Sequence, residues 1–408
     1  MKSLRFLGVA VMAILCAVPS FAQSDIEVFG FFQSFATHSF RTQKQTLPMP
    51  GAVTQEMNID NSVFSLQQAN IFASKDLGNN FGAFVNLEFV NSYSSDRGWG
   101  SLNLQEAFVK YEGSNSFNIK AGLFLPQFNN LYEIYNRMPL LPYIIRPFVY
   151  ETSLSGLLPP EDYLPSRGLV QAYGFFPAGD SKIDYAVYVG EAEDSYIVSD
   201  KKPMEFRPDA TGTSLVSLKT IGARVGVRSG GLKLGASLTM DSDNHRADTT
   251  LNSPGVGNGD IPRMRVGADL SYSTGGLTLN AELIMVNYTL TDAQLAVIKA
   301  NQMLGGDMNK LFYFASLQYD INDQLYVYGV FNSFKDNFSS VLKENLVGIS
   351  GGFGYRANDN VVLKLQLYRT QLSAKFPNAE PFKTMGIDGK PIYDLSIFSV
   401  YGGVSVAF

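Results

Sequence analysis

The most regular feature of the chain is an alternation of apolar and other residues in segments about ten residues long. It is clearest in 395–408, where one set of alternate positions is largely apolar and the other is small or polar. The first set is Phe398, Val400, Gly402, Val404, Val406 and Phe408, and the second includes Ser399, Gly403, Ser405 and Ala407. Successive side chains of a strand point to opposite faces, so this segment is predicted to be a β-strand long enough to cross a membrane.

Segments of similar kind recur along the chain and predict sixteen strands. Their ranges are 26–38, 62–74, 81–93, 102–112, 117–125, 167–177, 182–193, 216–228, 231–242, 262–274, 277–289, 310–321, 325–336, 346–357, 361–372 and 395–408. The connections alternate between short and long. The short ones, such as 229–230 and 275–276, are rich in Gly, Asn, Asp or Ser, which tolerate tight hairpins. The long ones include 39–61, 126–166 and 373–394.

Short turns at one end and long loops at the other are typical of an up-and-down membrane barrel. We therefore predict an all-β fold for residues 23–408, a 16-stranded antiparallel up-and-down transmembrane β-barrel. A soluble β-sandwich has no physical reason to alternate its loop lengths in this way.

The alternation also predicts which side chains face the lumen. On 361–372, Val361, Leu363, Leu365 and Leu367 face lipid, and Lys364 and Gln366 face inward. On 231–242 and 262–274 the inward set is Lys233, Ser237, Thr239, Asp241, Arg263, Arg265, Asp269 and Ser271. An Arg or Lys facing lipid costs about 2–4 kcal/mol at mid-bilayer, so these side chains are expected to face water. We predict a polar lining and a water-filled lumen, because sixteen strands enclose more space than side chains fill.

One long connection, 126–166, has an unusual composition, with seven prolines and many aromatic residues. Proline interrupts helices and paired strands, while the aromatic content is unlike that of a disordered linker. Long loops of this kind in compact domains are usually functional. We expect this third long loop to fold into the barrel and narrow it. The alternative is that it latches onto outer loops or a neighbouring subunit.

Charged residues on this loop and on the facing wall predict a constriction with a transverse electric field. The loop contributes Glu133, Arg137, Arg146, Glu151, Glu161 and Asp162. The wall contributes the cations Lys110, Lys120, Arg167, Arg224, Arg228 and Lys364, and the acids Glu88, Glu106, Glu282 and Asp320. The expected mechanism is passive: the loop excludes large solutes, and the charges select among ions and small hydrophilic solutes.

The N-terminus predicts export. Residues 1–22 combine a basic start, an apolar run and the ending Ser20-Phe21-Ala22, which is typical of a secretory signal peptide. Cys16, the one cysteine, falls inside this segment, so neither disulfides nor thiolate chemistry is expected in the exported chain. No later apolar run is long enough to predict a transmembrane helix. The net charge of −5 argues against a general nucleic-acid binder.

Candidate catalytic residues are few. The two histidines, His38 and His245, lie neither at metal-ligand spacing nor in a Ser-His-acid context. The glycine-rich run 255–259 precedes no predicted helix, so it is a weak signal for phosphate binding. The segment 290–304 has the composition of a short loop helix. The sequence therefore predicts that the protein is not an enzyme and uses no cofactor or metal.

The strand that ends in Phe408 resembles the terminal strand of bacterial outer-membrane proteins, whose C-terminal Phe is read by the barrel assembly machinery. The sixteen-strand pattern with an inward third loop resembles bacterial porins. Three local motifs are similar to those of the phosphate-selective porin O and P group: Gly122-Leu-Phe124-Leu-Pro126-Gln-Phe128, Phe148-Val-Tyr-Glu151 and Arg167-Gly-Leu-Val-Gln171-Ala-Tyr-Gly174. Gln127 separates Pro from Phe, Arg167-Gly168 is displaced by one, and no dense lysine cluster is present, so phosphate specificity is not implied.

The resemblance implies an outer-membrane protein that contacts lipid and lipopolysaccharide and assembles as a homotrimer. Two other functions remain open from the sequence. A substrate-specific channel for an anion, phosphate or sugar would use aromatic side chains to stack its solute, with Tyr132, Tyr135, Tyr143 and Tyr150 as candidates. A non-conducting adhesin would close its lumen.

Overall fold

The computed structural model describes residues 26–90, 101–151, 163–165, 168–191, 219–243, 261–289, 309–336, 344–376 and 382–408, and single residues at 292, 378 and 380. The predicted signal segment 1–22 lies outside the described residues. So does the expected loop helix 290–304, apart from Asp292.

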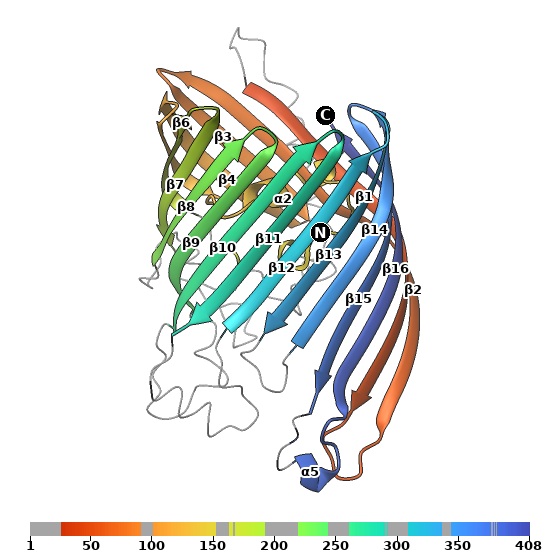
Figure 1. The fold of residues 1–408 in the computed structure, drawn as a ribbon. Coiled ribbons are helices and arrows are strands. Elements are labelled where there is room, and N and C mark those ends of the chain that lie inside the picture. The colour runs from red at the N-terminus through yellow and green to blue at the C-terminus, as the bar shows by residue number, and fades with distance from the viewer. Residues whose placement is uncertain are drawn as a thin grey trace, which may run out of the picture.

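Sixteen strands form one closed antiparallel barrel (Figure 1). They are β1 Ile26–Thr46, β2 Thr54–Gly78, β3 Phe81–Val90, β4 Ser101–Ser114, β5 Phe117–Phe124, β6 Gly168–Ala178, β7 Ser181–Glu191, β8 Lys219–Ser229, β9 Leu232–Asp243, β10 Ile261–Thr274, β11 Leu277–Tyr288, β12 Asn309–Asp320, β13 Leu325–Asp336, β14 Glu344–Asn358, β15 Val361–Lys375 and β16 Pro391–Ala407. Each strand pairs with its neighbours in sequence, and β16 closes the barrel against β1. The predicted fold class is confirmed.

Short hairpins gather at one end of the barrel, which we call the short-turn end. In the β10–β11 hairpin, Gly275 and Gly276 have φ angles of 51° and 82°. Two successive positive φ angles suit the twist of an antiparallel hairpin and favour glycine there. We call the opposite end the long-loop end. Within the described residues, no helix is long and apolar enough to cross a membrane.

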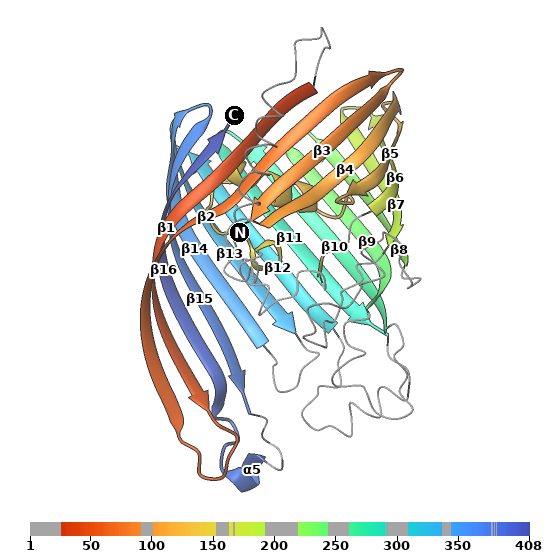
Figure 2. The ribbon, with the colours of Figure 1, turned by 180° about the vertical axis from the view of Figure 1, so that it is seen from behind.

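Two connections predicted as long loops are shorter than expected, because the strands on either side continue into them. β1 continues to Thr46 and β2 begins at Thr54, so the loop predicted at 39–61 shortens to 47–53. β15 continues to Lys375 and β16 begins at Pro391, with the short helix α5 Phe382–Met385 between them. The predictions were wrong because most of these residues are polar, so the apolar alternation ends while backbone pairing with the neighbouring strands continues. The four strands project beyond the rest at the long-loop end (Figures 1 and 2).

The outward face carries an apolar belt that ends abruptly. On β15, Leu363 and Leu367 face outward with 48% and 46% of their surface exposed, as predicted. The next outward positions toward the long-loop end, Arg369 and Gln371, are polar and also exposed. Exposed leucines suit lipid and exposed charges suit water, so this change marks one edge of the belt.

The inward face is not polar throughout, and that prediction was wrong. Polar and charged side chains line β8–β10, but an apolar cluster covers much of the inner wall from β11 through β16 to β1. Its wall members are Phe35, Ile284, Val286, Tyr288, Phe312, Phe314, Phe334, Leu346, Tyr368, Leu372 and Leu395. Strands β11 to β13 are therefore apolar on both faces over part of their length, and simple alternation does not distinguish inside from outside there.

Candidate functional site

The chain leaves the wall after Phe124, and residues 125–151 lie inside the barrel, where they contact inward-facing side chains from several sides (Figures 1 and 2). We call 125–151 the inner segment. It contains the helix α2 Leu131–Asn136 and the two single turns η1 Met138–Leu140 and η2 Phe148–Tyr150. Four prolines, at 126, 139, 142 and 147, prevent continuous strand pairing. The rest of the predicted loop, apart from 163–165, lies outside the described residues.

The first attachment of the inner segment is to β4 and β5. Glu106 Oε1 accepts a hydrogen bond from the Leu125 amide at 3.3 Å, and its Oε2 accepts one from Asn136 Nδ2 at 2.7 Å. Lys120 Nζ lies 4.2 Å from the centroid of the Phe124 ring and donates to the Leu125 carbonyl at 3.4 Å. A buried carboxylate and ammonium thus hold both the start of the segment and the end of α2.

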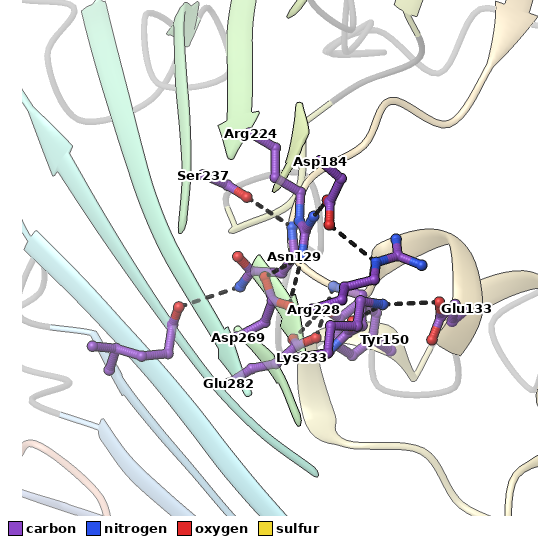
Figure 3. A network of polar contacts seen from close by, with 12 residues as sticks. Asn129, Glu133, Tyr150, Asp184, Arg224, Arg228, Lys233, Ser237, Asp269 and Glu282 are labelled. Atoms are coloured by element: carbon purple, nitrogen blue, oxygen red, sulfur yellow. Dashed lines mark hydrogen bonds and ion pairs between the residues drawn. The ribbon is translucent and has the colours of Figure 1, made fainter. Parts of the chain in front are cut away.

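The second attachment is to β9 and β11 (Figure 3). The Asn129 amide donates to Ser237 Oγ at 3.0 Å, and the Asn130 amide donates to Glu282 Oε1 at 3.0 Å. The Tyr150 hydroxyl donates to Glu282 Oε2 at 2.6 Å. Burial raises the pKa of the Tyr150 hydroxyl well above its ordinary value, so it stays protonated and keeps this donor.

The third attachment is to β15 and to β1, where Gln33 Nε2 donates to the Ile144 carbonyl at 3.1 Å. Lys364 Nζ donates to the carbonyls of Pro139 and Leu141, at 3.0 and 2.7 Å. Gln366 Oε1 accepts from the amides of Ile144 and Ile145, at 2.9 and 2.8 Å. The three attachments lie on well-separated strands, so the inner segment crosses the lumen.

Apolar packing fixes the same segment against the β11–β16 half of the wall. One cluster combines the inward-facing apolar residues of that half with apolar residues of the inner segment and with Tyr163 and Leu164. Its members from the inner segment are Phe128, Leu131, Ile134, Ile144, Ile145, Phe148, Val149 and Tyr150. Phe128, Ile144, Tyr150, Tyr163 and Phe312 expose no surface. Removing such side chains from water is the main favourable term in this contact.

The cross-section is largely filled at the level of the inner segment. Inward-facing polar side chains from strands on different sides of the barrel expose no surface: Gln33, Asn70, Asn86, Gln171, Thr239 and Gln366. Side chains of this kind would be exposed in a wide, water-filled barrel. The inner segment and the inward-facing side chains around it are therefore packed closely together at this level of the barrel.

Arg146 and Glu151 of the inner segment are buried together. Arg146 Nε lies 3.7 Å from Glu151 Oε2, and the Arg146 amide donates to the same oxygen at 3.2 Å. The Arg146 guanidinium also lies 5.4 Å from the centroid of the Tyr135 ring. Because each side chain exposes 3% or less, this pair stabilises the fold of the segment and has little contact with water.

A second group of charges lies near the short-turn end (Figure 3). Arg224 bridges Asp184 at 2.6 Å and Asp269 at 2.8 Å. Arg228 Nε lies 3.0 Å from Asp184, and Lys233 Nζ lies 3.0 Å from Glu133 on α2. These ion pairs connect β7, β8 and β10 with one another and β9 with the inner segment.

These charges border a cavity of about 270 Å³ that we call the basic cavity. Its charged lining residues are Lys110, Lys120, Arg137, Arg224, Arg228, Lys233, Glu112 and Glu133. Lys110 pairs with Glu112 at 2.9 Å. Arg137 is exposed and makes no ion pair within the part of the chain that the structure describes. The cavity therefore has an excess of positive charge.

The structure thus brings six of the residues predicted from sequence to one place, the basic cavity: Lys110, Lys120, Glu133, Arg137, Arg224 and Arg228. It places Lys364 elsewhere, on β15. Glu106 and Glu282 hold inner-segment amides, and Asp320 pairs with Arg356 at 2.8 Å. Glu161, Asp162 and Arg167 lie outside the described residues. Phe408 exchanges two backbone hydrogen bonds with Gly30, which ties the C-terminus to β1.

Several residues that hold the inner segment were not singled out from sequence. Ser237 was predicted to face inward but without a partner, and Gln33 lies in 26–38, where both faces are apolar or aromatic and alternation is blurred. Asp184 carried no signal beyond its strand position. Asp241 binds Arg263 at 2.8 Å and Arg265 at 2.5 Å, a buried group that alternation placed on one face without predicting the contacts.

Within the described segments, no three His, Cys, Asp or Glu side chains are grouped to hold a metal ion.

No family model and no curated protein matches the sequence. Solved structures of similar fold are outer-membrane porins and channels. An anion-selective porin from Comamonas acidovorans is 14% identical, with a TM-score of 0.54, and the match covers 95% of this chain and 100% of that one. The outer membrane channel DcaP of Acinetobacter baumannii is 13% identical, with a TM-score of 0.55, covering 95% and 99% of the two chains. At this identity the likeness shows the fold.

Proposed function

We propose that this protein is an outer-membrane porin, a passive diffusion channel for ions and small hydrophilic solutes. The observation that carries the proposal is the inner segment, fixed across the inside of a closed sixteen-stranded barrel by polar attachments on separate strands. A barrel of this size encloses a lumen, and a fixed segment inside it sets the size limit. The porin neighbours support the same function by analogy of fold.

Selectivity in this proposal comes from charges beside the passage. Lys110, Arg137 and Arg228 are the more accessible cations of the basic cavity, and Glu112 and Glu133 oppose them. Fixed charges close to a narrow passage raise the local concentration of counter-ions. The proposal includes export by the 1–22 segment, insertion through recognition of Phe408 by the assembly machinery, contact with lipid and lipopolysaccharide, and assembly as a homotrimer.

The test is single-channel recording of the refolded protein in a planar bilayer, with the reversal potential measured under a salt gradient. Stepwise conductance supports the channel. A reversal potential on the anion side supports control by the basic cavity, and one on the cation side assigns control to the acids. A correctly folded barrel that gives no conductance steps would refute the channel function and favour the alternative that the protein is an adhesin.

A substrate-specific channel is the second candidate. Tyr132 and Tyr173 line the basic cavity, so an aromatic surface lies beside its cations. Such a surface could stack a planar or sugar ring while the cations bind a carboxylate or phosphate. Saturable block of the conductance by a solute would distinguish this candidate from a general porin, which shows no saturation.

A further inference from the structure

Gln33 on β1 and Lys364 and Gln366 on β15 form a compact group that contacts the backbone of the inner segment between Pro139 and Ile145. Besides the four hydrogen bonds of Lys364 and Gln366 to the segment, Gln33 Nε2 donates to the Ile144 carbonyl at 3.1 Å. Five backbone groups are thus bound by three wall side chains. We call Gln33, Lys364 and Gln366 the clamp.

The clamp residues also hold one another in place. Lys364 Nζ donates to Gln33 Oε1 at 3.0 Å, and Ser405 Oγ donates to the same oxygen at 2.5 Å. Gln366 Nε2 donates to Ser350 Oγ at 3.0 Å. All three clamp side chains are buried, with 4% or less of their surface exposed. Hydrogen bonds to other wall side chains restrict the rotamers of the clamp, so these side chains are held by the wall as well as by the segment.

The wall between β1 and β15 has a notch that fits the segment. Strand β16 lies between them and presents Gly403 inward. A Cβ at Gly403 would lie 3.1 Å from Ile144 Cδ1, which is closer than most carbon contacts. The Ile144 side chain therefore packs where the wall has no side chain, directly beside the clamp.

The segment needs these partners because it cannot satisfy its own backbone. Pro139 and Pro142 lack an amide hydrogen, so no regular helix or strand pairing can form through 139–145. Its buried carbonyl and amide groups must find partners elsewhere. Lys364 has three donors, and its three oxygen partners use all of them. Those partners are neutral oxygens, and within the described part of the chain Lys364 forms no ion pair with a carboxylate.

We infer that Gln33, Lys364 and Gln366 are positioning residues that fix residues 139–145 against the wall, and that Lys364 acts through the segment it holds and not as a free charge facing the solute. An effect of the clamp on pore size rests on the proposed channel function. An effect of the clamp on the position of the segment does not depend on that function, and it is measured separately.

The test uses a reporter thiol. Cys16 is the one cysteine of the sequence, so a Cys16→Ser background leaves only the thiol introduced. Ile144→Cys places it at a position with no exposed surface, and Leu140→Cys places it at a position that is 68% exposed. The rate at which a small methanethiosulfonate modifies each reporter thiol is measured in the refolded barrel, with and without the substitution Lys364→Met. Lys233→Met is the matched control, since Lys233 contacts the segment only through the side chains of Asn130 and Glu133.

We expect Lys364→Met to raise the rate at Ile144→Cys by about ten- to a hundredfold, because it removes two hydrogen bonds that hold the segment. Lys233→Met should leave that rate unchanged, and Leu140→Cys should react at the same rate in every background. An unchanged rate at Ile144→Cys with Lys364→Met overturns the inference. Gln366→Leu, which removes the acceptor for two amides, gives the same test if Lys364→Met does not refold.

Conductance separates the clamp from the proposed function. If the unmodified protein conducts and Lys364→Met changes neither conductance nor thiol reactivity, the clamp is wrong and the channel stands. If thiol reactivity rises as expected but the unmodified protein does not conduct, the clamp stands and the channel is wrong. If the protein conducts, a larger or noisier conductance with Lys364→Met supports both.

Discussion

The basic cavity predicts that Arg137 has a measurable effect on ion selectivity. Among the cavity's cations, Lys110, Arg224, Arg228 and Lys233 each have an acid within 3.0 Å. Arg137 is exposed and has no such partner in the described residues. Replacing it by Glu changes the charge of the cavity by two units without removing an ion pair from the wall.

The size of the effect follows from Coulomb's law. A unit charge about 8 Å from a passing ion contributes about 0.5 kcal/mol in water. Screening in 0.1 M salt reduces this by roughly half. Two units therefore disfavour an anion by about 0.5 kcal/mol and favour a cation by about the same amount. The combined change of about 1 kcal/mol corresponds to a fall of about fivefold in the ratio of anion to cation permeability.

The assay is the reversal potential of single channels under a KCl gradient, with Arg137→Glu compared with the unmodified protein. Arg369→Glu is the control, because Arg369 is an exposed residue on the outward face of β15 and undergoes the same change of charge outside the lumen. A permeability ratio that stays the same in Arg137→Glu, or that moves equally in Arg369→Glu, would refute the assignment of the ion path to the basic cavity. A larger shift at lower salt is expected, because screening weakens.

Other positions give further predictions. Phe312→Ala removes a fully buried ring from the contact between wall and inner segment and should destabilise the folded barrel by about 3–5 kcal/mol, measured as a lower denaturant midpoint in micelles. Glu282→Leu leaves the Tyr150 hydroxyl without its acceptor at a cost of about 1–3 kcal/mol, and adding Tyr150→Phe should then recover part of the loss. Gly222→Val places a Cβ 2.1 Å from Tyr188 Cζ, so it should displace that ring and lower the midpoint by about 1–3 kcal/mol.

Each of these predictions has an outcome that contradicts it. A midpoint unchanged by Phe312→Ala would mean that the apolar cluster adds little to stability. Strict additivity of Glu282→Leu and Tyr150→Phe would mean that the two side chains do not interact. Gly402→Val is the control for Gly222→Val, since no atom lies within 4 Å of a Cβ at that position. Equal effects of the two valine substitutions would rule out the ring displacement.

The number of strands and the direction of most side chains could be predicted from sequence, because a strand repeats every two residues and the barrel has an apolar outside. Leu363, Lys364 and Gln366 were placed on the correct faces by this rule alone. The rule was wrong on strands whose inward face packs against the inner segment. Phe312 and Phe334 face inward but pack against the inner segment, so their strands are apolar on both faces. The extra length of β1 and β2 was also missed, since polar residues can continue a strand beyond the apolar belt.

Sequence by itself determined the architecture: sixteen strands, their order, the hairpins, and a proline-rich connection that cannot pair as a strand. Only the tertiary structure decided what that connection touches. Lys364 and Pro139 are 225 residues apart in the chain, and Tyr150 and Glu282 are 132 apart. Alternation reports whether a side chain faces inward, but closure of the barrel decides which inward-facing side chains come within hydrogen-bonding distance of a segment that crosses it. Lys364 and Arg137 look alike in sequence, as single cations near the lumen. Their surroundings differ because Lys364 is buried against two carbonyls of the segment and Gln33 Oε1, whereas Arg137 is exposed to water.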